Sequence, residues 1–225
     1  NPIPIPKTFK DPEKPVPVPV ERTGRPYTFK ERKLTASELE YWQQYGITPE
    51  ILEQYKVCSV VQFQSENADG NPFSYSSTKE EPIYGYKNKR FIKLYRPFSK
   101  TRFLYGGNFG ESYCFGLEQL PSKGDTLFIT GGEKDVLSLA AKGFHAICFN
   151  SETVTVPPNI IYKLTFRFKH IILLYDMDAT GVESAKKHEK QLCEYGVKRL
   201  LLPLQGTKTE KDISDYFRAG NSREN

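Results

Sequence analysis

The second half of the chain alternates short apolar runs with stretches of helical periodicity. Four apolar runs predict buried strands: "TLFIT", "HAICF", "HIILLY" and "VKRLLL". The intervening pattern predicts helices over residues 134–142, about 158–168, 179 to about 195, and from about 211. Strands that alternate with helices form a parallel sheet joined by right-handed crossovers. We therefore expect an α/β unit over residues 123–225, a parallel sheet flanked by helices.

The first half has a different pattern. Thr35, followed three residues later by Glu38, is typical of a helix start, and Thr48 opens a second candidate helix. Short strand-like pieces separated by turn signals then run over about 57–118 and predict a mostly antiparallel unit. We assign residues 31–122 to one small α+β subdomain, which makes the chain α+β overall.

Proline recurs through residues 1–30, in "IPIPKTFKDPEKPVPVPVERTGRP". Proline at this density removes backbone donors and favours an extended conformation. We expect a stiff, poorly packed linker. Because the sequence starts without Met and shows no basic-then-apolar leader, we expect a fragment of a longer, cytoplasmic protein.

Composition narrows the class of protein further. The 225 residues are enough for one large or two small domains, and no apolar run approaches the ~20 residues that span a bilayer. We expect no membrane association. The four cysteines never form C-x-x-C, and the three histidines are isolated, so we expect reduced thiols and no zinc site in this chain.

Positive charge is concentrated in one stretch. Residues 82–110 contain no acidic residue and seven basic ones, more than the whole net charge of +5. Eight aromatic residues lie in the same stretch, a combination that suits single-stranded nucleic acid. The alternative is a set of strands with aromatic side chains inward and solvated Lys and Arg outward. We expect core packing for most of the aromatics. We expect contact with nucleic acid or nucleotide for four cations: Lys93, Arg96, Lys100 and Arg102. A second possible track is Lys198, Arg199, Lys208 and Lys211.

Paired carboxylates follow the run "IILLY". Asp176 and Asp178 sit at the carboxyl end of a predicted parallel strand, where ligand sites gather. Side chains two apart on an extended backbone point to the same side, so the two anions can converge on a hard cation such as Mg²⁺. The alternative is that one aspartate caps the following helix and the other is solvated.

A second acidic position strengthens the metal interpretation. The first strand of the α/β unit ends in "TLFITGGEKD", which places Glu133 on the same sheet edge as the aspartates. A capping role in the first helical turn is the alternative for Glu133 alone. Asp212 and Asp215, after the fourth strand, fit a helix N-cap and a metal-site role equally well.

"YDMDAT" also satisfies the D-x-D-x-T pattern of haloacid dehalogenase phosphatases. That motif belongs on the first strand of its domain. Too few residues follow Asp178 to supply the later strands that carry the rest of that site, so we do not favour this resemblance.

The order of the motifs resembles the TOPRIM domain of topoisomerases and primases. That family has a Glu after its first strand and D-x-D after its third, as Glu133 and "DMD" have here. "GGEKDVLSLAAKGFHAICFN", the turn "FNSE" and Lys211-Asp212 to Asp215 are similar to phage and mobile-element primases and primase-helicases, relatives of bacterial replicative primase and Twinkle. The basic segment "FIKLYRPFSKTRFLYGGN" resembles the amino-terminal half of the same primase core.

The resemblance implies a DNA primase core, a DNA-directed RNA polymerase that makes short RNA primers by nucleotidyl transfer. Catalysis would rest on Glu133, Asp176 and Asp178, which with Asp212 would hold Mg²⁺ or Mn²⁺. Single-stranded DNA template and NTPs would be the partners, and Lys134 and Lys211 would join the four cations named above in binding them. The family's zinc-binding module would precede this fragment, and a helicase domain could follow it or act in trans.

Two other functions stay open. A TOPRIM nuclease would use similar acids for phosphodiester hydrolysis, and a nucleic-acid-binding adaptor would keep the fold without catalysis. A topoisomerase is not expected, because nothing marks a separate domain carrying a nucleophilic tyrosine, although 14 tyrosines prevent a strict exclusion.

Overall fold

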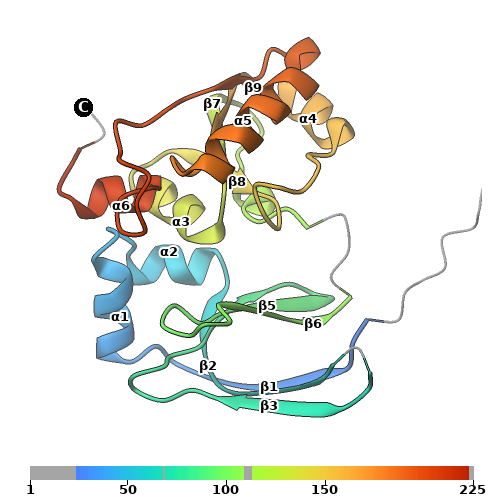
Figure 1. The fold of residues 1–225 in the computed structure, drawn as a ribbon, viewed down its shortest axis with the longest axis vertical. Coiled ribbons are helices and arrows are strands. Elements are labelled where there is room, and N and C mark those ends of the chain that lie inside the picture. The colour runs from blue at the N-terminus through green and yellow to red at the C-terminus, as the bar shows by residue number, and fades with distance from the viewer. Residues whose placement is uncertain (1–23, 68, 109–112, 223–225) are drawn as a thin grey trace, which may run out of the picture.

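The computed structural model describes residues 24–67, 69–108 and 113–222, and arranges them as two modules stacked on each other (Figure 1). Residues 1–23, most of the predicted linker, lie outside the described residues. Within the described ranges, no helix is long and apolar enough to cross a membrane.

The N-terminal module is built on a six-stranded antiparallel sheet. Its strands are β1 (Tyr27–Arg32), β2 (Val57–Glu66), β3 (Pro72–Ser76), β4 (Tyr84–Lys87), β5 (Phe91–Tyr95) and β6 (Phe103–Gly107). The order is β1-β2-β4-β5-β6, and β3 also pairs with β2. The antiparallel unit predicted over about 57–118 is confirmed. The predicted linker is wrong for residues 27–30, because "YTFK" opens β1 and pairs with β2.

Two helices, α1 (Ala36–Gln43) and α2 (Pro49–Gln54), lie between β1 and β2. Both start where the sequence predicts. Thr35 caps α1 in a complete capping box with Glu38, and the Thr48 side chain caps α2. Figure 1 shows α2 between the N-terminal sheet and the C-terminal module and α1 at one side, and residues of both helices belong to the hydrophobic cluster that joins the modules.

The C-terminal module is the predicted α/β unit. Its four parallel strands run in the order β10-β9-β7-β8: β7 (Gly124–Thr130), β8 (His145–Cys148), β9 (Phe168–Leu174) and β10 (Lys198–Arg199). The helices are α3 (Glu133–Ala141), α4 (Pro158–Thr165), α5 (Ala179–Gln191) and α6 (Ile213–Arg218), with short 3-10 turns η1 (Leu117–Gln119) and η2 (Cys193–Tyr195). The fourth strand is shorter than "VKRLLL" predicts: pairing stops at Arg199, and Leu200 and Leu201 are exposed.

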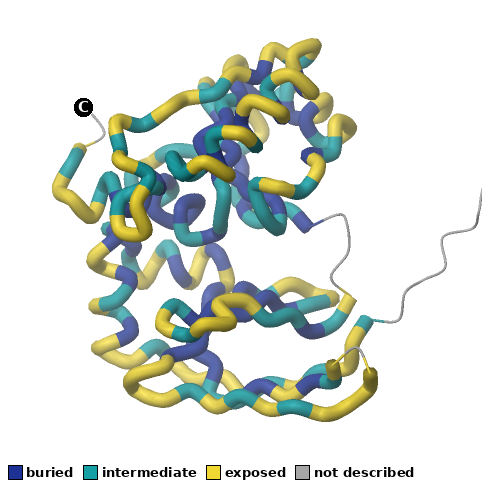
Figure 2. The backbone as a smooth tube through the Cα atoms, in the orientation of Figure 1, coloured by how far each residue is buried: buried dark blue, intermediate teal, exposed yellow. Residues whose placement is uncertain are grey.

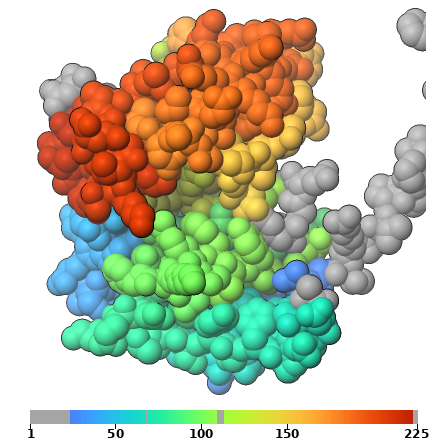
Figure 3. Space-filling view, viewed as in Figure 1, coloured from blue at the N-terminus to red at the C-terminus, as the bar shows by residue number. Residues whose placement is uncertain are grey.

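One hydrophobic core crosses the predicted boundary near residue 122. Trp42 and Tyr84 of the N-terminal module share a buried cluster with Leu137, Leu174 and Ile213 of the C-terminal module. Figure 2 shows buried backbone along both facing sides, and Figure 3 shows the red α6 region lying against the blue α1 region. Because the apolar area of each face is removed from water only by the other, the two modules stabilise each other.

Glu38 ties β1, α1 and β2 together. Its carboxylate is 4% exposed and accepts hydrogen bonds from Arg32 Nη2 (3.2 Å), the Thr35 backbone N–H (2.8 Å) and Ser59 Oγ (2.7 Å). Burial raises the pKa of Glu38, but these hydrogen bonds outweigh it and hold the pKa below its ordinary value of 4.5.

We expect Glu38→Gln to lower the free energy of unfolding by about 1–3 kcal/mol at pH 7, because the groups that donate hydrogen bonds to the Glu38 carboxylate would lose an ionised acceptor. A lowered folded pKa stabilises the fold at pH values above the unfolded pKa, and this contribution is lost as the pH falls through the folded pKa. Urea unfolding at pH 7 and at successively lower pH below 4.5 should show the gap between wild type and variant shrinking. Glu40→Gln, at an exposed position of the same helix, is the control. A gap that persists unchanged at low pH would contradict this role of the charge.

Candidate active site

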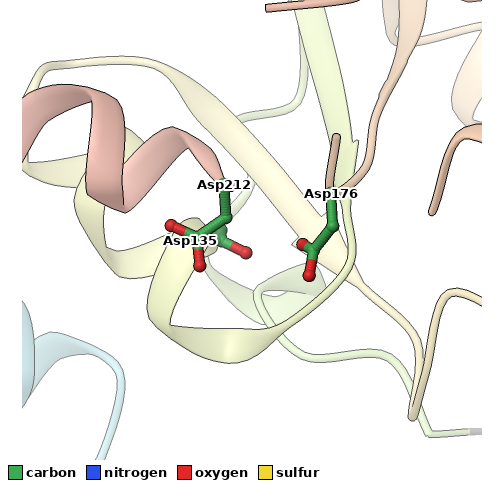
Figure 4. Close-up of side chains that lie close together, drawn as sticks. All are labelled: Asp135, Asp176 and Asp212. Carbon is green, nitrogen blue, oxygen red and sulfur yellow. The ribbon is translucent and has the colours of Figure 1, made fainter. Parts of the chain in front are cut away.

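Three carboxylates converge between the modules. Asp135, Asp176 and Asp212 come from α3, the end of β9 and the start of α6, and each offers an oxygen within 4.8 Å of the other two (Figure 4). Asp135 and Asp212 are buried. A set made only of carboxylate oxygens suits a hard divalent cation such as Mg²⁺ or Mn²⁺, so the residues fit the metal that the sequence predicts.

The parallel sheet positions these acids. β7 and β9 are neighbours and end side by side, so the turn after β7 and the residue after β9 meet at one edge. Asp212 caps α6 by accepting the Asp215 backbone N–H at 2.8 Å. Ser214, in the first turn of α6, donates to Asp135 at 2.6 Å and so fixes α6 to α3.

The pKa values of two of these three aspartates are raised, which shows that the negative charges in this group are poorly stabilised. Burial, and then repulsion from Asp212, raise the pKa of Asp135 well above its ordinary value. Burial also raises the pKa of Asp176, even though a hydrogen bond from Lys211 acts in the opposite direction. Anions this close and this poorly solvated are stable only when protonated or paired with positive charge.

Lysines supply part of that positive charge. Lys211 Nζ lies 2.5 Å from Asp176 Oδ2 and 3.0 Å from Asp178 Oδ2, and so bridges the D-x-D pair. Lys134 Nζ lies 3.0 Å from Asp212 Oδ2 and 4.3 Å from the centre of the Tyr45 ring. The pKa of each lysine is raised, because the attraction of the aspartates exceeds the effect of burial. Both lysines therefore remain cationic at neutral pH.

Glu133 lies in the same cavity but outside the three-acid group. Its carboxylate is 2% exposed and accepts from Lys93 Nζ at 2.6 Å and from Tyr113 OH at 2.5 Å. Helix geometry explains the separation, since residues two apart on a helix are rotated by roughly 200° about the helix axis and therefore point to nearly opposite sides. Glu133 therefore faces β5, whereas Asp135 faces the other aspartates.

Asp178 has the capping role that was the alternative for the D-x-D pair. It is the N-cap of α5 and accepts the Gly181 backbone N–H at 3.0 Å. Although burial raises the pKa of Asp178, hydrogen bonds from Gly181 and Lys211 hold it below its ordinary value. Asp178 thus shares Lys211 with Asp176 without joining the three-acid group.

The site opens into a cavity of about 400 Å³ with walls from both modules. The C-terminal wall includes Gly131, Asn150 and Glu152 as well as the acids, and the N-terminal wall comes from β4, β5 and β6. Four of the six predicted basic residues line the cavity: Lys93, Arg102, Lys134 and Lys211.

The basic segment differs from both interpretations of its sequence. Lys93 is 2% exposed, paired with Glu133 and hydrogen-bonded to the Asn150 carbonyl, so it is neither a solvated surface cation nor an exposed phosphate contact. Arg96 is also buried, bound to Glu81 and stacked 4.3 Å from the centre of the Tyr75 ring. Only Lys100 and Arg102 of the four are exposed. The reason is that both faces of β5 are covered: Ile92 and Leu94 pack in a cluster within the N-terminal module, and Tyr95 packs in the cluster shared with the C-terminal module. Arg96 directly follows this covered strand.

The expectation that most aromatics of this segment pack in the core holds for Tyr84, Tyr86 and Tyr95, which are buried. Phe98 and Phe103 instead are exposed, by 62% and 37%. Phe109 lies outside the described residues.

Sequence reasoning missed two acids. Asp135 follows Glu133 by two residues, and only the rotation of a helix shows which of the two meets the D-x-D pair. Glu152 ends the polar turn after β8, and its carboxylate lines the cavity beside Asp176. Burial, and then the charges of Asp176 and Asp178, raise the pKa of Glu152 to about 7.

Comparison with known proteins agrees with this fold. Residues 128–217 match the family described as Toprim-like. None of the curated proteins has a matching sequence. The solved structure of the primase fragment of the bacteriophage T7 primase-helicase protein is similar with a TM-score of 0.55 and 18% identity, over 92% of this chain and 78% of that one.

Two further solved structures are similar as well. The DnaG catalytic core has a TM-score of 0.62 at 18% identity, over 86% of this chain and 71% of that one. The Aquifex aeolicus primase, described by its zinc-binding and RNA polymerase domains, has a TM-score of 0.55 at 15% identity, over 82% of this chain and 53% of that one. Residues 128–217 therefore form a Toprim-like domain, and the chain has the fold of the catalytic core of DNA primases.

Proposed function

We propose that this chain is the catalytic core of a DNA primase, which copies single-stranded DNA into short RNA primers by metal-dependent nucleotidyl transfer. The observation that carries the proposal is the group of Asp135, Asp176 and Asp212 at the base of a cavity shared by both modules. That arrangement leaves room for a nucleotide on the acids and for a template along the basic module.

The residues of the cavity have distinct roles in this proposal. A divalent cation held by the three aspartates would neutralise the triphosphate and lower the pKa of the attacking 3′-hydroxyl. Lys134 and Lys211, already beside the aspartates, are placed to contact phosphate oxygens. Lys93 and Tyr113 fix the orientation of Glu133, which lines the cavity from the same wall as the three aspartates but points toward β5.

The template would enter over the turn between β5 and β6. This turn carries the exposed Phe98, Lys100 and Arg102, and β6 begins after it at Phe103. Arg102 and Phe103 also line the cavity. Exposed rings next to exposed cations suit a single strand, since bases stack on rings while cations neutralise phosphates.

Further domains are part of the proposal. The T7 relative is a fragment of a primase-helicase protein, and the Aquifex relative contains a zinc-binding domain. We propose that a zinc-binding module acts with this core to select start sites and that a helicase works beside it.

A template-dependent synthesis assay tests the proposal. Purified chain, single-stranded DNA of mixed sequence, labelled NTPs and Mg²⁺ should yield short oligoribonucleotides. Synthesis should stop with EDTA and return with excess Mg²⁺. Shortened DNA without RNA product would indicate a nuclease instead, and a gel shift without either product would indicate a non-catalytic adaptor.

Asp135→Asn and Asp176→Asn should each reduce synthesis by at least about a hundredfold, because each removes a charge that holds the cation while changing little volume. The temperature of unfolding without metal should stay level or rise, since repulsion among the acids falls. Asp125→Asn, an exposed acid at the other end of β7, is the control and should keep wild-type activity. Synthesis retained in Asp135→Asn would overturn the three-acid assignment.

The pair Lys100→Ala and Arg102→Ala should weaken binding to single-stranded DNA and flatten its dependence on salt. Each lost phosphate contact lowers the slope of log K against log salt by up to ~0.7. Lys186→Ala with Lys187→Ala, two exposed cations on α5, removes the same charge elsewhere and should leave the slope unchanged. Equal slopes in both double variants, measured by fluorescence anisotropy at three salt concentrations, would place the template on another surface.

Lys93 should act through Glu133, not through DNA affinity. Lys93→Met leaves a buried carboxylate unpaired and should lower the free energy of unfolding by about 3–5 kcal/mol. Adding Glu133→Gln should restore at least half of that loss, since no uncompensated charge remains. The exposed pair Lys169 and Asp125 is the control for the double-mutant cycle and should show little or no coupling, because solvent screens both charges. Additive effects of Lys93→Met and Glu133→Gln in urea unfolding would contradict the pairing.

A further inference from the structure

Glu152 is the acid of the cavity to which the reaction proposed above gives no role. It lies in the turn between β8 and α4, and Oε2 of its carboxylate is fully buried with no hydrogen-bond partner among the described residues. The carboxylate also interacts with the backbone N–H of Asp176. A buried carboxylate oxygen without a donor is costly, so its retention beside a second carboxylate needs a physical reason.

The space around Gly131 shows how the two acids face each other. A Cβ at Gly131 would lie 3.1 Å from Asp176 Oδ1 and 3.1 Å from Glu152 Oε2. The two oxygens therefore face the same point and are separated by no more than twice that distance. Lys211 contacts Asp176 through the other oxygen, Oδ2. The charge of Lys211 also acts on Glu152, but among the described residues no ion pair is made by the Glu152 carboxylate.

We propose that Glu152 is an additional metal ligand, which together with Asp176 Oδ1 holds a second divalent cation next to the one held by Asp135, Asp176 and Asp212. Asp176 then bridges the two cations, one on each side of its carboxylate. In two-metal sites the ions lie roughly 3.5–4 Å apart, a spacing that one bridging carboxylate spans. Two carboxylates suffice for the second position, since Mg²⁺ keeps several waters and completes its shell with substrate phosphates.

Two features of the chain fit this role. Glycine at position 131 leaves the space between the acids open, where any larger side chain would contact both oxygens. Glu152 also lines the same cavity as the three aspartates, so a cation at this position would be accessible to a nucleotide. This inference rests on the proposed function, because it adds a ligand to the metal centre of that reaction.

Metal binding without substrate tests the inference directly. MnCl₂ is titrated into wild type, Glu152→Gln and the control Glu183→Gln, an exposed acid on α5, by calorimetry and by electron paramagnetic resonance. We expect two Mn²⁺ sites in wild type and in the control. Glu152→Gln should weaken one of them by at least about tenfold and keep the other. Equal stoichiometry and affinity in wild type and Glu152→Gln would overturn the inference.

A second measurement guards against an altered fold. Anomalous diffraction from wild-type crystals soaked in MnCl₂ should show a peak between Glu152 and Asp176, and Glu152→Asp should restore part of the lost affinity by retaining a carboxylate. The absence of that peak, when the site at Asp135 is filled, would overturn the proposal and leave Glu152 as a protonated partner of Asp176.

The outcomes separate this inference from the proposed function. If wild type makes no primers but Glu152→Gln still loses one Mn²⁺, the second site stands and the primase proposal fails. If wild type makes primers and Glu152→Gln binds Mn²⁺ as wild type does, the primase proposal stands and Glu152 is not a ligand.

Discussion

The need to compensate buried negative charge governs the arrangement of this molecule. Glu133, Asp135, Asp176 and Asp212 are all drawn to one sheet edge, where little water can solvate them. Each of three acids receives an ammonium group from a different part of the chain: Glu133 from Lys93, Asp212 from Lys134 and Asp176 from Lys211. Among the described residues, the side-chain hydrogen bond to Asp135 comes from the Ser214 hydroxyl, and burial and the charge of Asp212 raise the pKa of Asp135 well above its ordinary value. Asp135 is therefore the acid of this group that has a hydroxyl in place of an ammonium partner.

Most elements of the fold could be predicted from hydrophobic periodicity and from helix-capping residues, because both depend on residues that are close in sequence. The alternation of strand and helix after Gly124 and the caps at Thr35 and Thr48 follow from side chains within a few residues of each other. The sequence does not predict strand β1, because "YTFKER" follows a proline-rich segment and lies partly in the predicted linker. Its pairing with β2 depends on residues more than twenty positions away in the chain. The two faces of β5 are both covered by contacts with distant segments, so Lys93 and Arg96 could not be told from surface cations by spacing alone.

The sequence predicts the sheet edge at which the acids gather in the structure, but it does not predict which acids form the three-acid group. D-x-D after a buried strand locates Asp176, because chain direction alone puts it at the ligand-binding end of the sheet. The choice between Glu133 and Asp135 depends on which face of α3 meets β5 and which meets α6, and no local pattern encodes it. An N-cap role and a role at a metal site, treated as alternatives for Asp212, are compatible: one oxygen accepts the Asp215 backbone N–H while the carboxylate stays within the three-acid group. An N-cap is a fixed position at a positive helix end, so it holds a carboxylate in place at no further entropic cost.

The sharing of charge across the cavity also explains why the two modules belong together. The C-terminal sheet alone would leave Glu133 without Lys93 and Tyr113, and would expose Leu137 and Leu174, which now pack against the N-terminal helices and strands. The N-terminal sheet alone would leave the ammonium of Lys93 without Glu133 and without the Asn150 carbonyl. Each module therefore supplies the counter-charge for a group that the other module helps to bury, and the hydrophobic contact between the modules keeps those charges together. The hydrophobic contact between the modules also brings the two walls of the cavity together. The packing that stabilises the fold therefore places basic residues of the N-terminal module opposite the acids of the C-terminal module.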